Sequence, residues 1–257
     1  MKYGYMPSFG KDIISEIRFA KKFFDFIEIT YNLDESYTVT RLKKIKRALG
    51  EFPTVGHLHW DLDFSTASEA EIKKALKQLS LFDKLGVKKI TIHPSPNCKL
   101  GKEAVIRNNI AAFNKLKRFC TKKKQIINIE NTLNPPFNKP LTMRRLFTSL
   151  KSFRFTFDTG HAAIRSALDI RKFLRIVGKK PSHVHLSNTV GNNDHLPFTD
   201  KKKLCSILSE IKNVCGNPTV TFEIFYSLHG RKKIALQDSK RRKLLLWHLR
   251  IARKYSF

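Results

Sequence analysis

Cysteine is scarce in this chain: only four occur, and no two form a CxxC pair. The spacing gives no zinc knuckle and no sign of a disulfide framework, which favours a reducing compartment. Long apolar runs are also missing, and the Leu244–Trp247 segment, one of the longest, is far too short to cross a bilayer. The first residues lack the apolar core of a signal peptide. We therefore expect a cytoplasmic protein with no membrane partner.

Acidic residues are few relative to basic ones. The 21 Asp and Glu stand against 50 Lys and Arg, and the formal net charge is +29. The basic residues are spread along the whole chain, in runs such as Lys122–Lys124, Lys201–Lys203 and Lys240–Lys243. Charge runs are usually solvated faces, but a charge of this size also attracts polyanions. Two interpretations stay open: a generally basic surface, and attraction to nucleic acid or to a phosphorylated substrate.

Short apolar runs alternate with longer amphipathic segments along the chain. The runs predict strands at residues 2–6, 25–30, 54–59, 88–93, 125–130, 153–158, 182–186 and 218–224. The segments predict helices at Ser68–Leu85, Glu103–Lys122, Thr142–Ser149, Leu168–Val177, Lys201–Lys212 and Asp238–Lys254. A helix after nearly every strand favours a parallel sheet of the α/β class. No linker divides residues 1–257, so we expect one domain.

Polar residues mark the ends of these predicted strands. Seven apolar runs end, or nearly end, on a carboxylate or an imidazole: Glu28, His57, His93, Glu130, Asp158, His185 and Glu223. Such groups are costly in buried strands unless the strand ends converge on something that needs them. An open sheet brings a ligand to only some strand ends, and the GxGxxG loop of dinucleotide folds is absent. We therefore predict a single (β/α)8 TIM barrel, with its active site at the carboxyl ends of the strands.

Four of these residues come from consecutive predicted strands: Glu130, Asp158, His185 and Glu223. One imidazole and three carboxylates suit a divalent ion, and Mn²⁺, Mg²⁺, Co²⁺ and Zn²⁺ all fit this donor set. Carboxylates gathered at one barrel mouth repel one another unless a cation lies among them. The sequence therefore predicts a site for one divalent metal ion.

Local motifs carry a resemblance to a known group of barrels. The segments GHLHWDLDF, IHPSP, INIENT, FTFDTGHA, HVHLSNTVGNNDHLPF and TFEIF occur in this order. Together they make nearly the whole chain similar to the xylose-isomerase-like TIM-barrel superfamily. The resemblance implies an isomerase or epimerase acting on a sugar or sugar phosphate. The alternative that it implies is a zinc-dependent abasic-site DNA phosphodiesterase of the endonuclease IV type.

The resemblance also implies roles for the predicted metal ligands. Glu130, Asp158, His185 and Glu223 match the metal quartet of the isomerase and epimerase branch. In that branch the two glutamates also act as acid and base on opposite faces of the sugar. A proton beside a carbonyl can be removed only if the enolate is stabilised, and a divalent cation on the substrate oxygens does this. Proton transfer by the two glutamates across a metal-bound enediolate would give isomerisation or epimerisation.

Five further residues are expected to contact the substrate: Glu28, His57, His93, His161 and His195. Glu28 matches a residue at the barrel mouth of related enzymes. In the nuclease branch, His57 and His93 match ligands of an additional zinc ion, and His161 and His195 match ligands of a third. That alternative therefore implies two or three Zn²⁺. Trp60 either lines the pocket or packs beside it.

The chain departs from the nuclease pattern close to His195. An aspartate is usual two residues before this histidine, where the chain has Asn193, and the adjacent Asp194 is the remaining candidate. Asn188 also stands where an aspartate is usual. The first prediction is therefore an isomerase or epimerase, the second an abasic-site phosphodiesterase, and the third a barrel retained only for binding. The sequence predicts no oligomeric state.

Overall fold

Eight parallel strands form a closed barrel in the computed structural model, which describes residues 1–31, 37–97, 99–164, 170–229 and 232–255. The order around the barrel is β1-β10-β7-β6-β5-β4-β3-β2. The strands are β1 Lys2–Tyr5, β2 Phe26–Thr30, β3 Thr54–His57, β4 Lys89–Ile92, β5 Ile126–Glu130, β6 Arg154–Asp158, β7 His183–Leu186 and β10 Thr219–Phe222. The predicted (β/α)8 barrel is confirmed, and each predicted strand is found within two residues of its expected ends.

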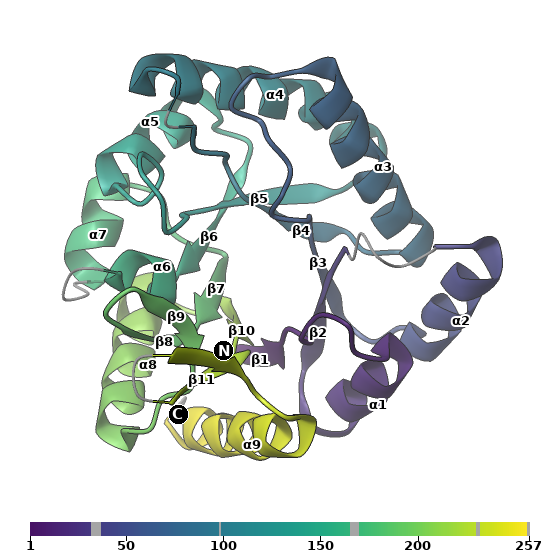
Figure 1. The fold of residues 1–257 in the computed structure, drawn as a ribbon, viewed down its shortest axis with the longest axis vertical. Helices are drawn as coiled ribbons and strands as arrows, with labels where there is room; N and C mark the ends of the chain where they lie inside the picture. Colours follow the sequence, from purple (N-terminus) through teal and green to yellow (C-terminus); the bar gives the residue numbers. More distant parts are fainter. Residues whose placement is uncertain (32–36, 98, 165–169, 230–231, 256–257) are drawn as a thin grey trace.

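Helices surround the barrel (Figure 1). They are α1 Ile13–Phe23, α2 Val39–Leu49, α3 Glu69–Leu85, α4 Lys102–Lys122, α5 Pro140–Ser149, α6 Thr159–Ala163, α7 Ile170–Val177, α8 Lys201–Cys215 and α9 Asp238–Lys254. Six of them occupy the predicted segments, although the expected start of α7 at Leu168 lies outside the described residues. We did not predict α1, α2 or the short α6. Basic residues crowd α2, which buries only Ile45 and Leu49, so its apolar stripe is narrow.

Helix α3 illustrates how the sequence sets the boundaries of these helices. The side chain of Ser68 accepts a hydrogen bond from the Glu71 backbone N–H and caps the first turn. Gly86 ends the helix in the left-handed conformation with a φ of 83°, which a residue with a side chain rarely adopts. The face between these ends buries Leu79 and Phe82 against the barrel. Such burial stabilises the fold by about 1.5–3 kcal/mol for each large apolar side chain.

Side chains alternate along the barrel strands between an apolar outer face and a polar interior. The outer face packs beneath the helices and includes Ile90, Ile127, Phe155, Val184 and Val220, which are all buried. The interior holds hydrogen bonds that cross the barrel, such as the one of 3.1 Å between Thr91 Oγ1 and Thr156 Oγ1. The polar side chains of the strands therefore point into the barrel, and several of them lie near its carboxyl end.

Two short hairpins follow the last barrel strands and lie over the carboxyl end of the barrel (Figure 1). The first pairs β8 Asn188–Val190 with β9 Asn193–Leu196, and the second pairs β11 Tyr226–His229 with β12 Lys232–Ala235. The Phe225 N–H, just before β11, donates a hydrogen bond of 3.1 Å to the His195 carbonyl in β9 and so links the two hairpins. Neither hairpin was predicted. Among the described residues, no helix is long and apolar enough to span a bilayer.

Candidate metal centre

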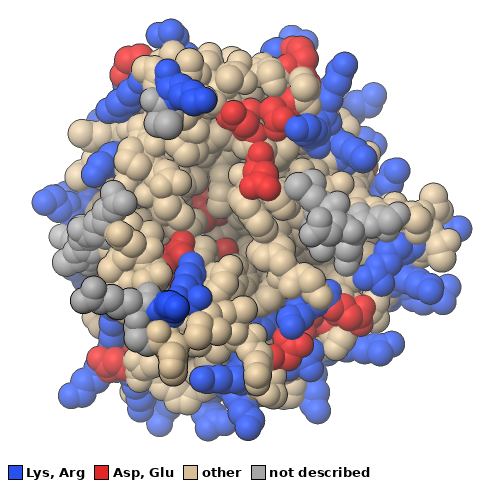
Figure 2. Space-filling model, viewed as in Figure 1, with Lys and Arg blue, Asp and Glu red and all other residues tan. Residues whose placement is uncertain are grey.

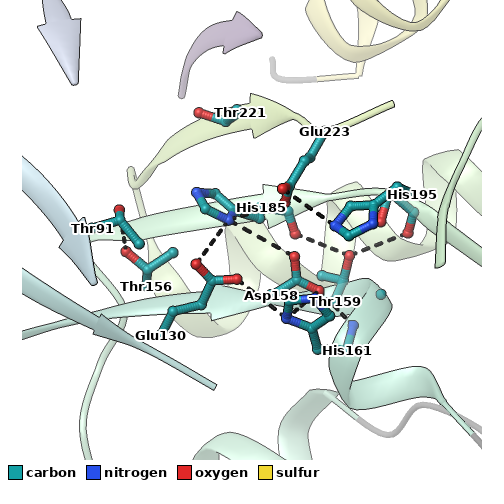
Figure 3. A network of polar contacts seen from close by, with 12 residues as sticks. Thr91, Glu130, Thr156, Asp158, Thr159, His161, His185, His195, Thr221 and Glu223 are labelled. Atoms are coloured by element: carbon teal, nitrogen blue, oxygen red, sulfur yellow. Dashed lines mark hydrogen bonds and ion pairs between the residues drawn. The ribbon is translucent and has the colours of Figure 1, made fainter. Parts of the chain in front are cut away.

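The four predicted metal ligands meet inside the carboxyl end of the barrel (Figure 3). His185 Nδ1 lies 3.2 Å from Glu130 Oε2, 3.8 Å from Asp158 Oδ2 and 3.1 Å from Glu223 Oε2. One ligand atom from each of the four residues lies within 4.8 Å of the others. Adjacent strands place them there, since β5, β6, β7 and β10 are consecutive in the barrel. The sequence-based grouping of these four residues agrees with this geometry.

The polar atoms at this point make ion-pair contacts but lack hydrogen bonds. Within the described part of the chain, four buried atoms that face the centre have no hydrogen-bond partner: Glu130 Oε1, Asp158 Oδ2, His185 Nδ1 and Glu223 Oε2. Leaving buried polar atoms unsatisfied costs about 1–3 kcal/mol each. Burial raises the pKa of Asp158 to about 7, and the charges of Glu130 and Glu223 add to the increase while His161 opposes it. A divalent cation would give the unsatisfied atoms a partner and would reduce the repulsion among the carboxylates. The donor set therefore fits a metal ion.

Glu28 fixes the orientation of His185 from below. Both Glu28 carboxylate oxygens lie 3.2 Å from His185 Nε2, and Oε2 also lies 2.9 Å from His183 Nε2 and accepts from Thr221 Oγ1 at 2.6 Å. Burial alone would raise the pKa of Glu28, but His185 and His183 hold it well below its usual value. The charged carboxylate therefore takes the Nε2–H of His185 and leaves Nδ1 for the metal centre.

Our expectation that Glu28 lies at the barrel mouth does not hold. In the β2–β3 register, Glu28 pairs with Val55, whereas His57 pairs with Thr30, so Glu28 lies two residues deeper than His57. Its side chain is fully buried and does not line the cavity above the centre. The position of Glu28 within β2 explains the difference, because β2 and β3 end on the paired residues Thr30 and His57, and Glu28 comes two residues before the end of its strand.

His57 and His93 both point at Glu130. Their Nε2 atoms lie 3.2 Å and 3.0 Å from Glu130 Oε2. His57 donates its Nδ1–H to the Leu58 carbonyl at 2.7 Å, so its Nε2 is free to face the carboxylate or a metal ion. His57, Glu130 and His185 form a second set of potential ligands that shares two members with the first.

The short helix α6 places Asp158 and His161 at the centre. Asp158 is the last residue of β6 and caps α6 by accepting a hydrogen bond from the His161 backbone N–H. His161 donates its Nδ1–H to the Asn131 carbonyl at 3.0 Å, which turns Nε2 toward the mouth. Gly160 makes this turn possible, since a Cβ there would lie 2.5 Å from Ser187 Oγ.

His195 and Asp194 complete the mouth of the barrel. His195 has a φ of 55°, an unfavourable backbone conformation for a residue with a side chain. This conformation directs Nε2 to 3.2 Å from Glu223 Oε1 and Nδ1 to 3.2 Å from Asp194 Oδ1. Asp158, His161 and His195 form a further set of potential ligands. Asp194 lies beside it, with Oδ2 at 3.6 Å from His161 Nε2.

A cavity of about 430 Å³ opens above the centre. It is lined by Phe9, Trp60, Phe225, Tyr226 and Lys233, together with Glu223 and all four predicted substrate-contacting histidines, His57, His93, His161 and His195. Figure 2 shows the central hollow with carboxylates inside it, while Lys and Arg are spread over the rim and the sides. Trp60 is 44 % exposed and stacks on His59 with ring centroids 4.1 Å apart. A volume of this size suits a small-molecule ligand.

Three residues near the centre were not assigned a role from the sequence. His183 precedes His185 by two positions, and strand alternation was the signal that would have placed both on the interior face. Asp194 was left open beside Asn193, and the structure turns its carboxylate into the mouth. Lys233 lies in the cavity wall, and no local pattern distinguishes it from the many other lysines of the chain.

Comparison with known proteins agrees with this architecture. The family described as xylose isomerase-like TIM barrel matches residues 17–243. No curated protein sequence matches the chain. D-psicose 3-epimerase from Clostridium cellulolyticum H10, solved with D-tagatose, has a TM-score of 0.80 at 15 % identity, over 99 % of both chains. The 3-keto-D-glucoside 4-epimerase of E. coli has a TM-score of 0.73 at 16 % identity, over 97 % of this chain and 99 % of its own. Endonuclease IV from Thermus thermophilus has a TM-score of 0.69 at 15 % identity, over 99 % of this chain and 98 % of its own.

Proposed function

Because the chain belongs to the xylose isomerase-like TIM barrel family, we propose that it is a metal-dependent isomerase or epimerase of sugars or sugar phosphates. The observation that carries this proposal is the convergence of four buried atoms without a hydrogen bond, from Glu130, Asp158, His185 and Glu223, beneath a cavity of small-molecule size. The sugar epimerases among the similar structures support the same class of reaction. Several ions suit the centre, since Mn²⁺, Zn²⁺, Mg²⁺ and Co²⁺ share these donors.

In this proposal Glu130, Asp158, His185 and Glu223 hold one divalent ion. The bound ion would serve as a Lewis acid that draws charge from the carbonyl and hydroxyl oxygens of a sugar. Each glutamate has a second oxygen with which to accept or return a proton. Glu223 is the more accessible of the two, because it lines the cavity and Glu130 is fully buried behind the histidines.

The proton would move at Glu223 Oε1, which lies 3.2 Å from His195 Nε2. His195 orients this carboxylate and lowers the pKa of Glu223 against the effect of burial. On the other side of the centre, Glu130 Oε1 lies 3.2 Å from His161 Nδ1 and has no hydrogen-bond partner among the described residues. The two carboxylates therefore flank the centre, as proton transfer on two faces of one carbon requires.

Exchange of substrate hydrogen with solvent tests this proposal. We would incubate the Mn²⁺-loaded protein with ketohexoses, pentuloses and their phosphates in D₂O and detect deuterium beside the carbonyl by NMR. Glu223→Gln should slow exchange by about 10²–10⁴-fold at saturating Mn²⁺, because one proton-transfer group is lost. Glu103→Gln, a surface carboxylate paired with Arg145, is the matched control and should exchange normally. Equal exchange in Glu223→Gln would refute the assignment.

A metal-dependent phosphodiesterase of abasic DNA is the second candidate. It is favoured by two of the additional ligand sets, one that contains His57 and one that contains His161 with His195, and by Asp194 beside the latter. The net charge of +29 would attract a polyanion. Nicking of a duplex with one abasic site, in the presence of Zn²⁺, tests it. Duplex binding that does not weaken between low and physiological salt would remove its electrostatic support.

A further inference from the structure

Lys233 brings an ammonium group to the edge of the metal centre. It lies on β12, and its Nζ donates a hydrogen bond of 2.5 Å to Asp194 Oδ1. Nζ also lies 4.2 Å from the centroid of the Tyr226 ring, and the Lys233 side chain is 27 % exposed. Among the described residues that line the cavity, Lys233 is the only lysine or arginine.

Asp194 connects this ammonium group to two histidines of the centre. Its Oδ1 lies 3.2 Å from His195 Nδ1, and its Oδ2 lies 3.6 Å from His161 Nε2. These histidines and Asp158 offer ligand atoms within 4.8 Å of one another, and Asp194 would be the natural fourth ligand of an ion there. Lys233 therefore already binds the carboxylate that a second metal ion would need.

We propose that Lys233 takes the place of a metal ion beside Asp158, His161 and His195, and so limits the protein to the one tightly bound divalent ion of the quartet. The buried Asp194 carboxylate needs a positive partner, and Lys233 supplies it. A cation beside His161 and His195 would also be repelled by the ammonium charge one carboxylate away. The inference rests on the proposed function, because one ion in the quartet is what the isomerase chemistry uses.

Lys233→Met tests this role, because methionine keeps an unbranched side chain of similar length and removes the charge. Lys233→Arg retains the charge, and Lys232→Met removes a neighbouring exposed lysine from the same strand. Each metal-free protein would be titrated with Zn²⁺ against a chromogenic chelator, and zinc per chain would be measured by mass spectrometry after desalting. Circular dichroism would check the fold.

The proposal predicts one zinc ion per chain in the unmodified protein, in Lys233→Arg and in Lys232→Met. Lys233→Met should retain two ions, with the second bound at least about tenfold more tightly than in the unmodified protein. One ion with unchanged affinity in both the unmodified protein and Lys233→Met would overturn the inference and leave the proposed function standing. Two or three ions in the unmodified protein would overturn it in favour of the phosphodiesterase. No bound ion at all would overturn the proposed function as well.

Discussion

Replacing Glu28 with glutamine should weaken metal binding at a site that Glu28 does not touch. Glu28 acts through His185, whose Nε2 lies 3.2 Å from both carboxylate oxygens and whose Nδ1 faces the metal centre. Glutamine has nearly the same shape but no charge, and only one of its two terminal atoms accepts a hydrogen bond. His185, His183 and Thr221 would then compete for a single acceptor.

The expected loss follows from this geometry. Removing the hydrogen-bonded partner of a metal-binding histidine typically lowers metal affinity by about 10–100-fold, or about 1.4–2.8 kcal/mol. The free energy of unfolding of the metal-free protein should fall by about 1–3 kcal/mol as well, because a buried donor is left without an acceptor. The two effects are separable, because the loss of affinity is measured by metal binding and the loss of stability is measured by unfolding the metal-free protein in excess chelator.

The assay is a chelator-competition titration with Mn²⁺ or Zn²⁺, paired with denaturant unfolding in excess chelator. Glu16→Gln provides the matched control, because Glu16 is also buried and its carboxylate is bonded to Tyr5, Arg241 and Arg242. It should lose stability but keep the affinity for metal of the unmodified protein. Normal metal affinity in Glu28→Gln, at normal occupancy, would refute the argument that Glu28 positions His185.

Three further predictions concern pH and the cavity wall. Burial lowers the pKa of His248 to about 4, so between about pH 6.5 and 4 the unfolded chain binds a proton that the folded chain does not. Stability should therefore fall by up to about 3 kcal/mol as pH drops through this window, and less in His248→Gln, as denaturant unfolding at each pH would measure. Metal affinity should rise between about pH 5 and 8, because the ion must displace the proton from Asp158, whose pKa is about 7. Chelator competition would measure the affinity across this range, and an affinity that does not change with pH would contradict the prediction. Trp60→Ala should raise the KM for substrate by about 2–10-fold without changing metal affinity, since the ring lines the cavity and stacks on His59, which is not in the metal quartet. An unchanged KM would assign Trp60 to packing alone.

The predictable part of the site follows from strand alternation and strand order. Glu130, Asp158, His185 and Glu223 lie at or next to the ends of four consecutive strands, and the adjacency of these strands in the barrel brings them together. Local sequence was sufficient because each ligand is fixed by its own strand. The outer ring of helices was similarly predictable wherever an apolar stripe was wide, as in α3, and not where basic residues narrowed it, as in α2.

The remaining part depends on contacts between distant segments. The depth of Glu28 depends on where β2 ends, and the pairing of Thr30 with His57 across β2 and β3 sets that end two residues beyond Glu28. The pairing of Lys233 with Asp194 joins two hairpins that lie 39 positions apart in the sequence. A lysine in a chain with 50 basic residues carries no signal of such a role until the fold places it in the cavity wall.

Metal content per chain tests the central claim most directly, in protein purified without chelator or an affinity metal. The account predicts about one divalent ion per chain, lost in Glu223→Gln and retained in His57→Ala, because Glu223 is in the quartet and His57 is not. An ion retained at full affinity in Glu223→Gln would contradict it. So would two or three ions whose binding depends on His57, His93 and His161.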